Sequence, residues 1–307
     1  MIKKTVIFFS LLAALFGVAK IYQEASLSFC LSNICYEETS FSPKEFAAIV
    51  DPEKLSTVKK ILNQNYSFLG KGNQSYAFIS EDSQYVLKFF KFGHLKQNFF
   101  LNFLPKNAFL ENFLNKKLKA QEERFFKVFE GYHVAYTEDP ENCALIYIHL
   151  NKTDHLQQSV TVKDNFKSLH TINLDSVVFI VQEKVVPTRD ILGALLKKGD
   201  VEGAKLKIKQ LFSLYLAQYK KGLYDRDHNL AHNTGFKDDK AIRLDVGKFK
   251  KDPSIKDPLS YKKDLEKIAF VRLKRFVSTY YPQYKEEICH AMEEELAEIF
   301  TKEFELL

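Results

Sequence analysis

The stretch from residue 222 to 249, GLYDRDHNLAHNTGFKDDKAIRLDVGKF, is the feature that most constrains this chain. An Asp- and Asn-rich loop is followed by a short apolar run at 241–244 and then by Asp-x-Gly at 245–247. Polar side chains such as Asp227 and Asn233 are costly to hold near a core unless they bind something. The pattern therefore indicates a loop that binds a ligand, and a metal ion with phosphates fits its chemistry. An Asx-rich surface turn before an ordinary strand is the alternative.

The stretch resembles the catalytic loop and Asp-Phe-Gly segment of the protein-kinase-like superfamily, since a long amphipathic segment (201–219) precedes it and apolar residues follow it. In that family the first Asp orients the nucleophile, an Asn holds a metal ion, and the second Asp holds Mg²⁺ against the nucleotide phosphates. The resemblance implies these two Asp roles for Asp227 and Asp245.

The Asn of the motif has two candidates. The family pattern places it five residues after the catalytic Asp, which here is His232, and Asn233 stands one residue further on. Both are kept as candidate metal ligands. Asp225 stays open as an alternative acid, because Asp225-Arg226 also resembles the Asp-Arg-His of lipid-kinase-like relatives.

Residues 66–91 alternate like two strands joined by a turn. Gly70 and Gly72 form Gly-x-Gly, Ser75 stands where a third glycine would, and Lys88 falls in the second strand. This resembles the kinase glycine-rich loop and strand lysine. The resemblance implies that the loop approaches the phosphates of ATP and that the lysine contacts them. A hairpin that merely contains glycines is the alternative.

A helix predicted over 107–130 supplies the glutamate that, in a kinase, pairs with the strand lysine. Glu122 is the candidate, since Leu118 and Phe126 would face inward beside it. Glu111 and Glu123 stay open as alternatives.

Further elements follow in kinase order. Strands are expected at 132–136, 144–150 and 177–181, and 182–187 resembles the hinge that bonds adenine. Helices are expected at 188–198, 201–220, 261–279 and 283–304, with Pro282 between the last two.

The order implies an α+β, two-lobed, protein-kinase-like fold. The nucleotide-binding, β-rich N-lobe would span 66–186, and the helical C-lobe with the catalytic loop would span 187–307. Because Ala-Pro-Glu is missing after Gly247, the C-lobe looks more like aminoglycoside-phosphotransferase-type or atypical kinases. The acceptor is therefore a small molecule, a lipid or a protein.

The amino end reads as a signal peptide or signal anchor over 1–22, with an N-terminal hydrophobic, transmembrane helix as the anchored form. Lys3 and Lys4 precede an uncharged run from Thr5 to Ala19, and this charge asymmetry places the body across the membrane. Residues 23–65 are expected to form a linker with short helices. We expect a membrane-anchored or exported protein.

Length, net charge and cysteine content limit the classes of partner that we expect for this chain. The length of 307 residues suits one large domain or two lobes, and the net charge of +6 is spread along the chain, so no nucleic-acid partner is expected. Four cysteines make no metal set. Cys30 and Cys35 form either a small disulfide loop, in an oxidising compartment, or two unrelated thiols.

We therefore predict a kinase-like transferase that moves the γ-phosphoryl group of ATP, with Mg²⁺, to an unknown hydroxyl acceptor. Its catalytic residues would be Asp227, Lys88 and Glu122. A pseudokinase that serves as a membrane-associated interaction module is the second hypothesis. An unrelated membrane-anchored protein is the third.

Overall fold

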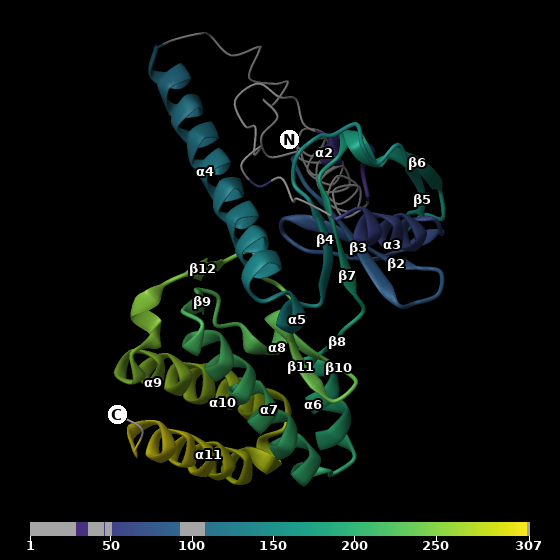
Figure 1. The fold of residues 1–307 in the computed structure, drawn as a ribbon. Helices are drawn as coiled ribbons and strands as arrows, with labels where there is room; N and C mark the ends of the chain where they lie inside the picture. Colours follow the sequence, from purple (N-terminus) through teal and green to yellow (C-terminus); the bar gives the residue numbers. More distant parts are fainter. Residues whose placement is uncertain (1–28, 36–45, 47–50, 93–107, 306–307) are drawn as a thin grey trace, which may run out of the picture. The chain divides into compact units, whose positions relative to one another are not determined.

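A computed structural model describes residues 29–35, 46, 51–92 and 108–305 (Figure 1). The chain divides into two compact units, residues 1–39, 51–97 and 152–179 in the first and 40–50, 98–151 and 180–307 in the second. The hydrophobic segment predicted over 1–22 lies outside the described residues. Within the described ranges, no helix combines the length and the apolar character that a membrane span requires.

The first unit is rich in strands. Its elements are α2 (Leu31–Ile34), α3 (Pro52–Leu62), β1 (Tyr66–Lys71), β2 (Ser75–Ser80), β3 (Tyr85–Phe90), β5 (Ser159–Lys163), β6 (Leu169–Asn173) and η3 (Leu174–Ser176). In α3, Pro52 occupies the first turn, where its missing N–H costs no hydrogen bond, and the helix buries Val58, Ile61 and Leu62.

The prediction of two strands over 66–91 is wrong, because the segment forms three. The backbone N–H of Gly72 donates to the Ser75 carbonyl (2.9 Å), which closes a hairpin turn inside what looked like one long strand. The β5–β6 hairpin was also not predicted, although Val160 and Val162 alternate with more exposed neighbours as strand residues do.

The largest sheet has seven strands in the order β4-β7-β3-β2-β1-β5-β6, where β4 is Leu145–His149 and β7 is Phe179–Glu183. The division between the two units falls within β7. Antiparallel pairing joins β1 to β2 and β2 to β3, and β1 runs parallel to β5. The expected α+β class is confirmed.

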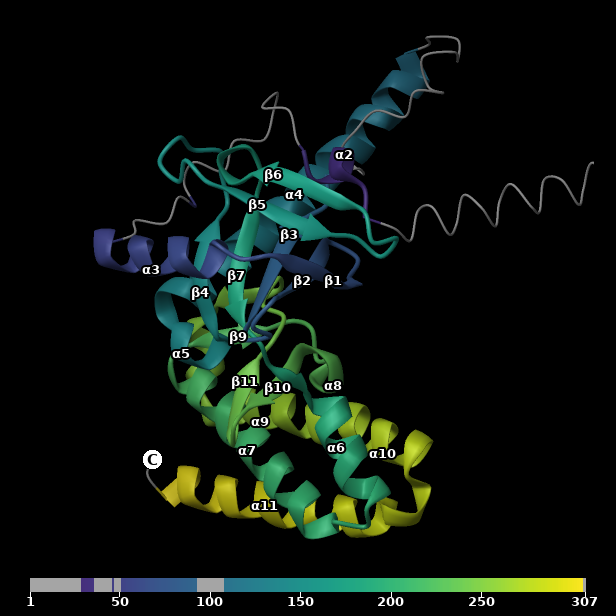
Figure 2. The same cartoon turned by 90° about the vertical axis from the view of Figure 1, so that its right-hand side faces the viewer.

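The second unit is mainly helical (Figures 1 and 2). Besides β4 and most of β7, its elements are α4 (Ala108–Glu138), α5 (Pro140–Cys143), β8 (Val186–Pro187), α6 (Thr188–Lys197), α7 (Val201–Lys220), β9 (Leu223–Asp225), α8 (Leu230–Asn233), β10 (Thr234–Lys237), β11 (Lys240–Arg243), β12 (Phe249–Lys251), η4 (Pro253–Lys256), α9 (Pro258–Lys267), the π-helical η5 (Ile268–Leu273), α10 (Lys274–Tyr280), η6 (Pro282–Tyr284) and α11 (Lys285–Glu305).

The prediction of a strand at 132–136 is wrong, because α4 continues through it to Glu138. Buried side chains at Phe125, Phe129 and Tyr132 keep the three-to-four-residue spacing of a helix past residue 130. The helix ends one residue before Asp139, which precedes Pro140 and so disfavours helical backbone.

Helix α7 agrees with its prediction and forms the centre of the helical core. Its side chains Leu211, Phe212 and Tyr215 are buried in a cluster with α9 and α11, and Figure 2 shows these three helices side by side. Gly222 follows the helix with a φ of 76°, a left-handed conformation that favours glycine. This turn directs the chain into β9.

Candidate functional site

Two segments of the second unit are hydrogen-bonded side by side, the loop that follows β9 and the Asp-x-Gly segment that precedes β12. Strands β9 and β12 pair antiparallel, with Asp225 opposite Phe249. Next to this pair the Arg226 N–H donates to the Lys248 carbonyl (3.4 Å). The start of the polar loop therefore lies beside the end of the Asp-x-Gly segment in space.

Asn233 ties the other end of the loop to the same segment. Its backbone carbonyl accepts from the N–H groups of Leu244 (2.7 Å) and Asp245 (3.2 Å). Its side-chain Nδ2 donates to the backbone carbonyl of Asp227 (3.5 Å). The second unit therefore brings Asp227, Asn233 and Asp245 together, although the first and last are far apart in the chain.

The Asp227 carboxylate is about one-third exposed and forms an ion pair with Lys248 Nζ (2.8 Å). Its other oxygen accepts from the Asn229 N–H (3.2 Å). Burial acts to raise the pKa of Asp227, but the hydrogen bond and charge of Lys248 outweigh it, so this pKa lies below its ordinary value. The carboxylate is therefore ionised at neutral pH.

Asp245 is exposed and held by its own turn. Its Oδ1 accepts from the Gly247 N–H (3.0 Å). Within the described part of the chain, Oδ2 has no hydrogen bond or ion pair. This leaves one carboxylate oxygen able to bind a cation next to Asn233.

A buried polar network supports the loop from behind. Arg243 donates from Nη1 to Asp225 (3.0 Å) and from Nε and Nη2 to Gln218 Oε1 (3.2 and 2.5 Å). Gln218 Nε2 in turn donates to Asp139 (2.8 Å). Asp225 Oδ1 accepts from the Asp227 N–H (2.7 Å), so the network fixes the backbone at the predicted catalytic residue.

Burial raises the pKa of Asp225 to about 6, and the charge of Arg243 opposes that rise. Asp225 was kept open as an alternative acid in the sequence, but its side chain is almost fully buried against Arg243. Sequence reasoning missed Arg243 and Gln218. The signal was a single cation inside the apolar run 241–244.

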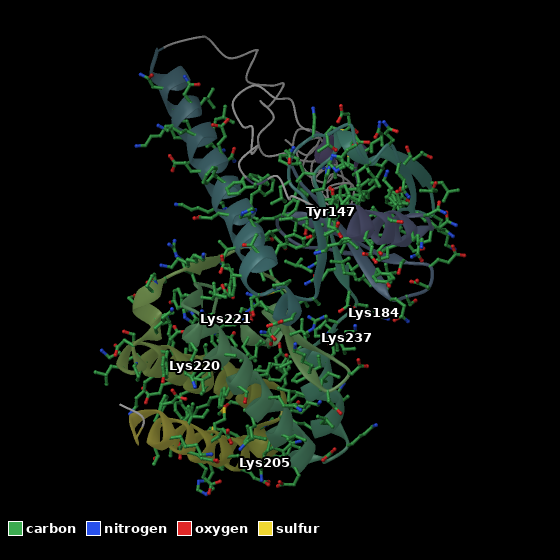
Figure 3. All side chains as sticks on the ribbon, viewed as in Figure 1. Tyr147, Lys184, Lys205, Lys220, Lys221 and Lys237 are labelled. Carbon is green, nitrogen blue, oxygen red and sulfur yellow. The ribbon has the colours of Figure 1, made fainter. Side chains whose placement is uncertain are left out.

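Three further contacts hold this region in place. His228 Nε2 contacts Asp264 Oδ1 (2.5 Å), and the Tyr219 hydroxyl donates to the other oxygen of that carboxylate (2.5 Å). Lys221, labelled in Figure 3, forms an ion pair with Asp139 (2.6 Å). His228 thus bonds the loop to α9, while Tyr219 and Lys221 bond the end of α7 to α9 and to the turn after α4.

Helix α4 packs directly on the Asp-x-Gly segment at Gly131. A Cβ at this position would lie 2.4 Å from the Val246 carbonyl oxygen and 3.2 Å from the Phe249 nitrogen. Only a residue without a side chain permits this approach.

Glu122, the predicted partner of Lys88, lies on helix α4 and is half-buried, whereas the alternative Glu123 is exposed.

The glycine-containing hairpin lies in the first unit. Gly70 is opposite Ala77 on β2, and Ala77 is opposite Lys88 on β3. Directly opposite residues share a face of the sheet, so Gly70 and Lys88 lie in one row on one face. A Cβ at Gly70 would meet nothing within 4 Å, and one at Gly72 only Ser75 atoms at 3.9 Å. Packing therefore does not require glycine at either position.

Lys91 is a candidate that the sequence did not single out. Its Nζ donates to the Gly72 carbonyl (2.5 Å) and lies 4.4 Å from the Tyr76 ring centroid. Burial, together with the nearby charge of Lys71, lowers the pKa of Lys91 to about 8. It supports the glycine turn from the carboxyl end of β3.

Among the described residues, no group of three or more His, Cys, Asp or Glu side chains is placed to hold a metal ion. A kinase-type site needs fewer protein ligands, since phosphate oxygens complete the coordination. The Asn233 amide and the Asp245 carboxylate supply the oxygen ligands that Mg²⁺ prefers. His232, the alternative ligand, is exposed and lines a pocket between α6, α8 and α10.

The four cysteines, Cys30 and Cys35 among them, are free thiols.

No protein-family profile matches the sequence. No curated protein matches it either. Among solved structures, three of WbdD match with probability 1.00. One is a complex of WbdD with the kinase inhibitor LY294002, with 15% identity, a TM-score of 0.39 and coverage of 76% of this chain and 45% of that one.

A second WbdD structure, described as that of a bifunctional kinase-methyltransferase, has 14% identity, a TM-score of 0.35 and coverage of 75% and 47%. A third, at 2.2 Å resolution, has 14% identity, a TM-score of 0.35 and coverage of 77% and 50%. The chain spans half or less of the WbdD chains that it matches. At these identities and TM-scores no residue role transfers from WbdD to this chain.

Proposed function

We propose that this protein is a kinase-like phosphotransferase, which moves the γ-phosphoryl group of ATP to a hydroxyl group of an acceptor. The observation that carries the proposal is the convergence of Asp227, Asn233 and Asp245 through the hydrogen bonds of the Asn233 backbone and side chain. A polar surface turn that forms through local hydrogen bonds alone does not require bonds to a distant segment. Here the Asp-x-Gly segment, which begins eighteen residues after Asp227 (roughly five helical turns of chain), is hydrogen-bonded to both ends of the loop.

Each residue has a role that suits its surroundings. Asp227, kept ionised by Lys248, would orient the acceptor hydroxyl and take its proton. The hydroxyl oxygen then forms a bond to the γ-phosphorus, while the bond to the bridging oxygen breaks and ADP leaves with its electron pair. Lys88 would contact the phosphates and Glu122 would hold Lys88 in place.

Mg²⁺ would be held by the side-chain oxygens of Asn233 and Asp245. The Asn233 amide donates through Nδ2 to Asp227, which leaves its Oδ1 as an acceptor, and Asp245 Oδ2 is likewise available among the described residues. The metal would neutralise charge on the phosphates. Asn233 fits this role better than His232, because its backbone is bonded to Asp245.

The glycine hairpin would cover the phosphates. Open space at Gly70 and Gly72 allows a ligand to approach the backbone. The turn is held by the hydrogen bonds of Gly72 with Ser75 and with Lys91.

A nucleotide-dependent thermal shift tests the proposal. At about 100 times its dissociation constant, ATP with Mg²⁺ should stabilise the fold by roughly 2.7 kcal/mol. Asp245→Asn and Lys88→Met should each remove this shift and leave the unliganded protein folded. Asp239→Asn is the matched control, because Asp239 is almost fully exposed. No shift in the wild-type protein would overturn the proposal.

A pseudokinase is the second candidate. Ser75 replaces the third glycine of the motif and the candidate Asn stands one residue late. The Asp227 carboxylate also forms an ion pair with Lys248 in this structure. A pseudokinase would show the Mg-ATP shift without any release of ADP, so measuring ADP on the same samples separates the two candidates.

We also propose that residues 1–22 direct the protein to a membrane or across it, on the strength of the basic start and the uncharged run to Ala19. Cell fractionation of the full chain, with and without residues 1–22, is the test. The full chain should be in the membrane or exported fraction, and finding both forms in the cytosol would contradict the proposal.

A further inference from the structure

The second unit contains a pocket of about 490 Å³ between α6, α8 and α10. Figure 2 shows these three helices next to one another. Charged and aromatic side chains share its wall. The lining residues are Arg189, Asp190, Gly193, Ala194, Lys197, His232, Phe276, Tyr280 and Tyr281.

The charged groups of the pocket favour an anion. Arg189 Nε contacts Asp190 (3.1 Å), but both side chains are about half exposed, and such a pair is weak. Within the described ranges, the Nη groups of Arg189 and the ammonium of Lys197 have no hydrogen bond or ion pair. Two cations therefore face one carboxylate, and a cationic ligand would meet repulsion.

The aromatic groups favour a flat or ring-shaped ligand. The Phe276 ring contacts both tyrosines, with its centroid 5.4 Å from that of Tyr280 and 6.0 Å from that of Tyr281. Tyr280 is 66% exposed, although large apolar rings are usually buried. The Tyr281 hydroxyl lies 2.8 Å from the place that a Cβ on Gly193 would take, so the absence of a side chain at 193 lets Tyr281 pack closely against α6 at this end of the pocket.

The pocket adjoins the proposed catalytic loop through α8. His232 lines the pocket, and the next residue, Asn233, is bonded to Asp245 and to Asp227. A molecule in the pocket would therefore lie one residue along the chain from the proposed metal ligand. Pockets that combine aromatic walls with a few polar groups are typical of small-molecule sites.

We propose that this pocket holds the acceptor, and that the acceptor is a hydroxyl-bearing ring compound with an anionic group. The inference rests on the proposed phosphotransferase function. Lys197 and Arg189 would bind the anionic group, and the rings of Phe276 and Tyr280 would pack against the ligand ring. A polycationic acceptor of the aminoglycoside kind does not fit this charge pattern.

Three pyranoses that differ in charge provide the probes, glucuronate (anionic), glucose (neutral) and glucosamine (cationic). Saturation-transfer NMR on the full chain, without nucleotide, measures their binding. Glucuronate should bind roughly fivefold more tightly than glucose, as expected for one partly solvated charge contact. Glucosamine should bind more weakly than glucose.

Variants identify the site. Lys197→Glu should reverse the order, so that glucosamine binds better than glucuronate, and Tyr280→Ala should weaken all three sugars. Lys198→Ala is the matched control, because Lys198 is the next residue, is exposed, and does not line the pocket. Equal binding of the three sugars, or an order unchanged in Lys197→Glu, would overturn the inference.

The outcome is separable from that of the Mg-ATP test. A Mg-ATP shift without charge-dependent sugar binding would end the pocket assignment and leave the phosphotransferase proposal standing. Charge-dependent sugar binding in a protein that Mg-ATP does not stabilise would overturn the assignment of this pocket to an acceptor.

Discussion

The Arg243 guanidinium is 1% exposed, lies 4.2 Å from the Tyr215 ring centroid, and donates to Asp225 and Gln218. Burying a charge is costly unless it is paired and hydrogen-bonded. Here the ion pair with Asp225 and the hydrogen bonds to Gln218 offset this cost, and Asp225 also accepts from the backbone N–H of Asp227. The network thus positions the proposed catalytic residue without touching a substrate.

We predict that Arg243→Met lowers the free energy of unfolding by about 3–5 kcal/mol, since it leaves Asp225 buried without its partner. Urea denaturation measures this loss. Arg189→Met, at a half-exposed arginine, should change stability by less than about 0.5 kcal/mol. A loss in Arg243→Met no larger than that of the control would contradict the account.

Lys248 lowers the pKa of Asp227 through a hydrogen bond and its positive charge. The folded-state pKa of Asp227 lies below its ordinary value of 3.8, so the pair stabilises the protein above about pH 4 and this contribution disappears as the pH falls through the lower folded pKa. Because the pair is partly exposed, Lys248→Met should cost less than about 1 kcal/mol at pH 7.

The same substitution should raise the pKa of Asp227 and shift the acid limb of the turnover profile to higher pH. The measurement is ADP release across the acid pH range in wild type and Lys248→Met. An unchanged acid limb would mean that Asp227 is not the titrating base.

At the scale of the residue, the sequence singles out charged side chains by their position in a motif, but it does not show which contacts they make. Asp227 stands out because it lies in an Asp- and Asn-rich loop, and Asp245 because it begins Asp-x-Gly directly after an apolar run. Arg243 and Gln218 do not, because their importance comes from burial beside partners distant in the chain. The choice between His232 and Asn233 also needed the backbone bond to Asp245, which motif spacing does not reveal.

Helix α4 packs closely against the Asp-x-Gly segment at Gly131. Alanine normally stabilises a helix relative to glycine by about 1 kcal/mol. Gly131→Ala should instead destabilise the protein, by about 1–3 kcal/mol, because its Cβ would overlap the backbone at Val246.

Thermal unfolding measures the effect of Gly131→Ala, and Glu130→Ala, at the exposed neighbour on the same helical turn, is the control. Stabilisation by Gly131→Ala would show that α4 does not press on this segment. A destabilised but nucleotide-binding variant would show that the contact supports the fold alone.

Element prediction succeeded where one period extends over many residues and failed where a tertiary contact sets the boundary. Helix α7 was predicted to within a residue because its apolar stripe is long and Gly222 ends it. Residues 132–136 look like a strand in isolation, but the buried stripe of α4 continues through them. The turn at Gly72 was missed because the alternation of apolar residues persists on both sides of it.

At the scale of the whole molecule, the proposed phosphate-binding residues and the proposed catalytic and metal-binding residues lie in different units. The glycine hairpin and Lys88 belong to the first unit, whereas Asp227, Asn233 and Asp245 belong to the second. The order of these motifs along the chain predicted the α+β class. The joint role of Lys88 with the two aspartates stays a prediction.

The binding of Mn²⁺-ATP, followed by the loss of the free Mn²⁺ signal in electron paramagnetic resonance, tests the central claim most directly, since Mn²⁺ accepts the same oxygen ligands as Mg²⁺. Asn233→Ala and Asp245→Asn should each weaken binding at least tenfold, equivalent to about 1.4 kcal/mol. His232→Ala should bind as the wild-type protein does. Unchanged binding in Asp245→Asn, or a loss in His232→Ala that Asn233→Ala does not share, would contradict the site described above.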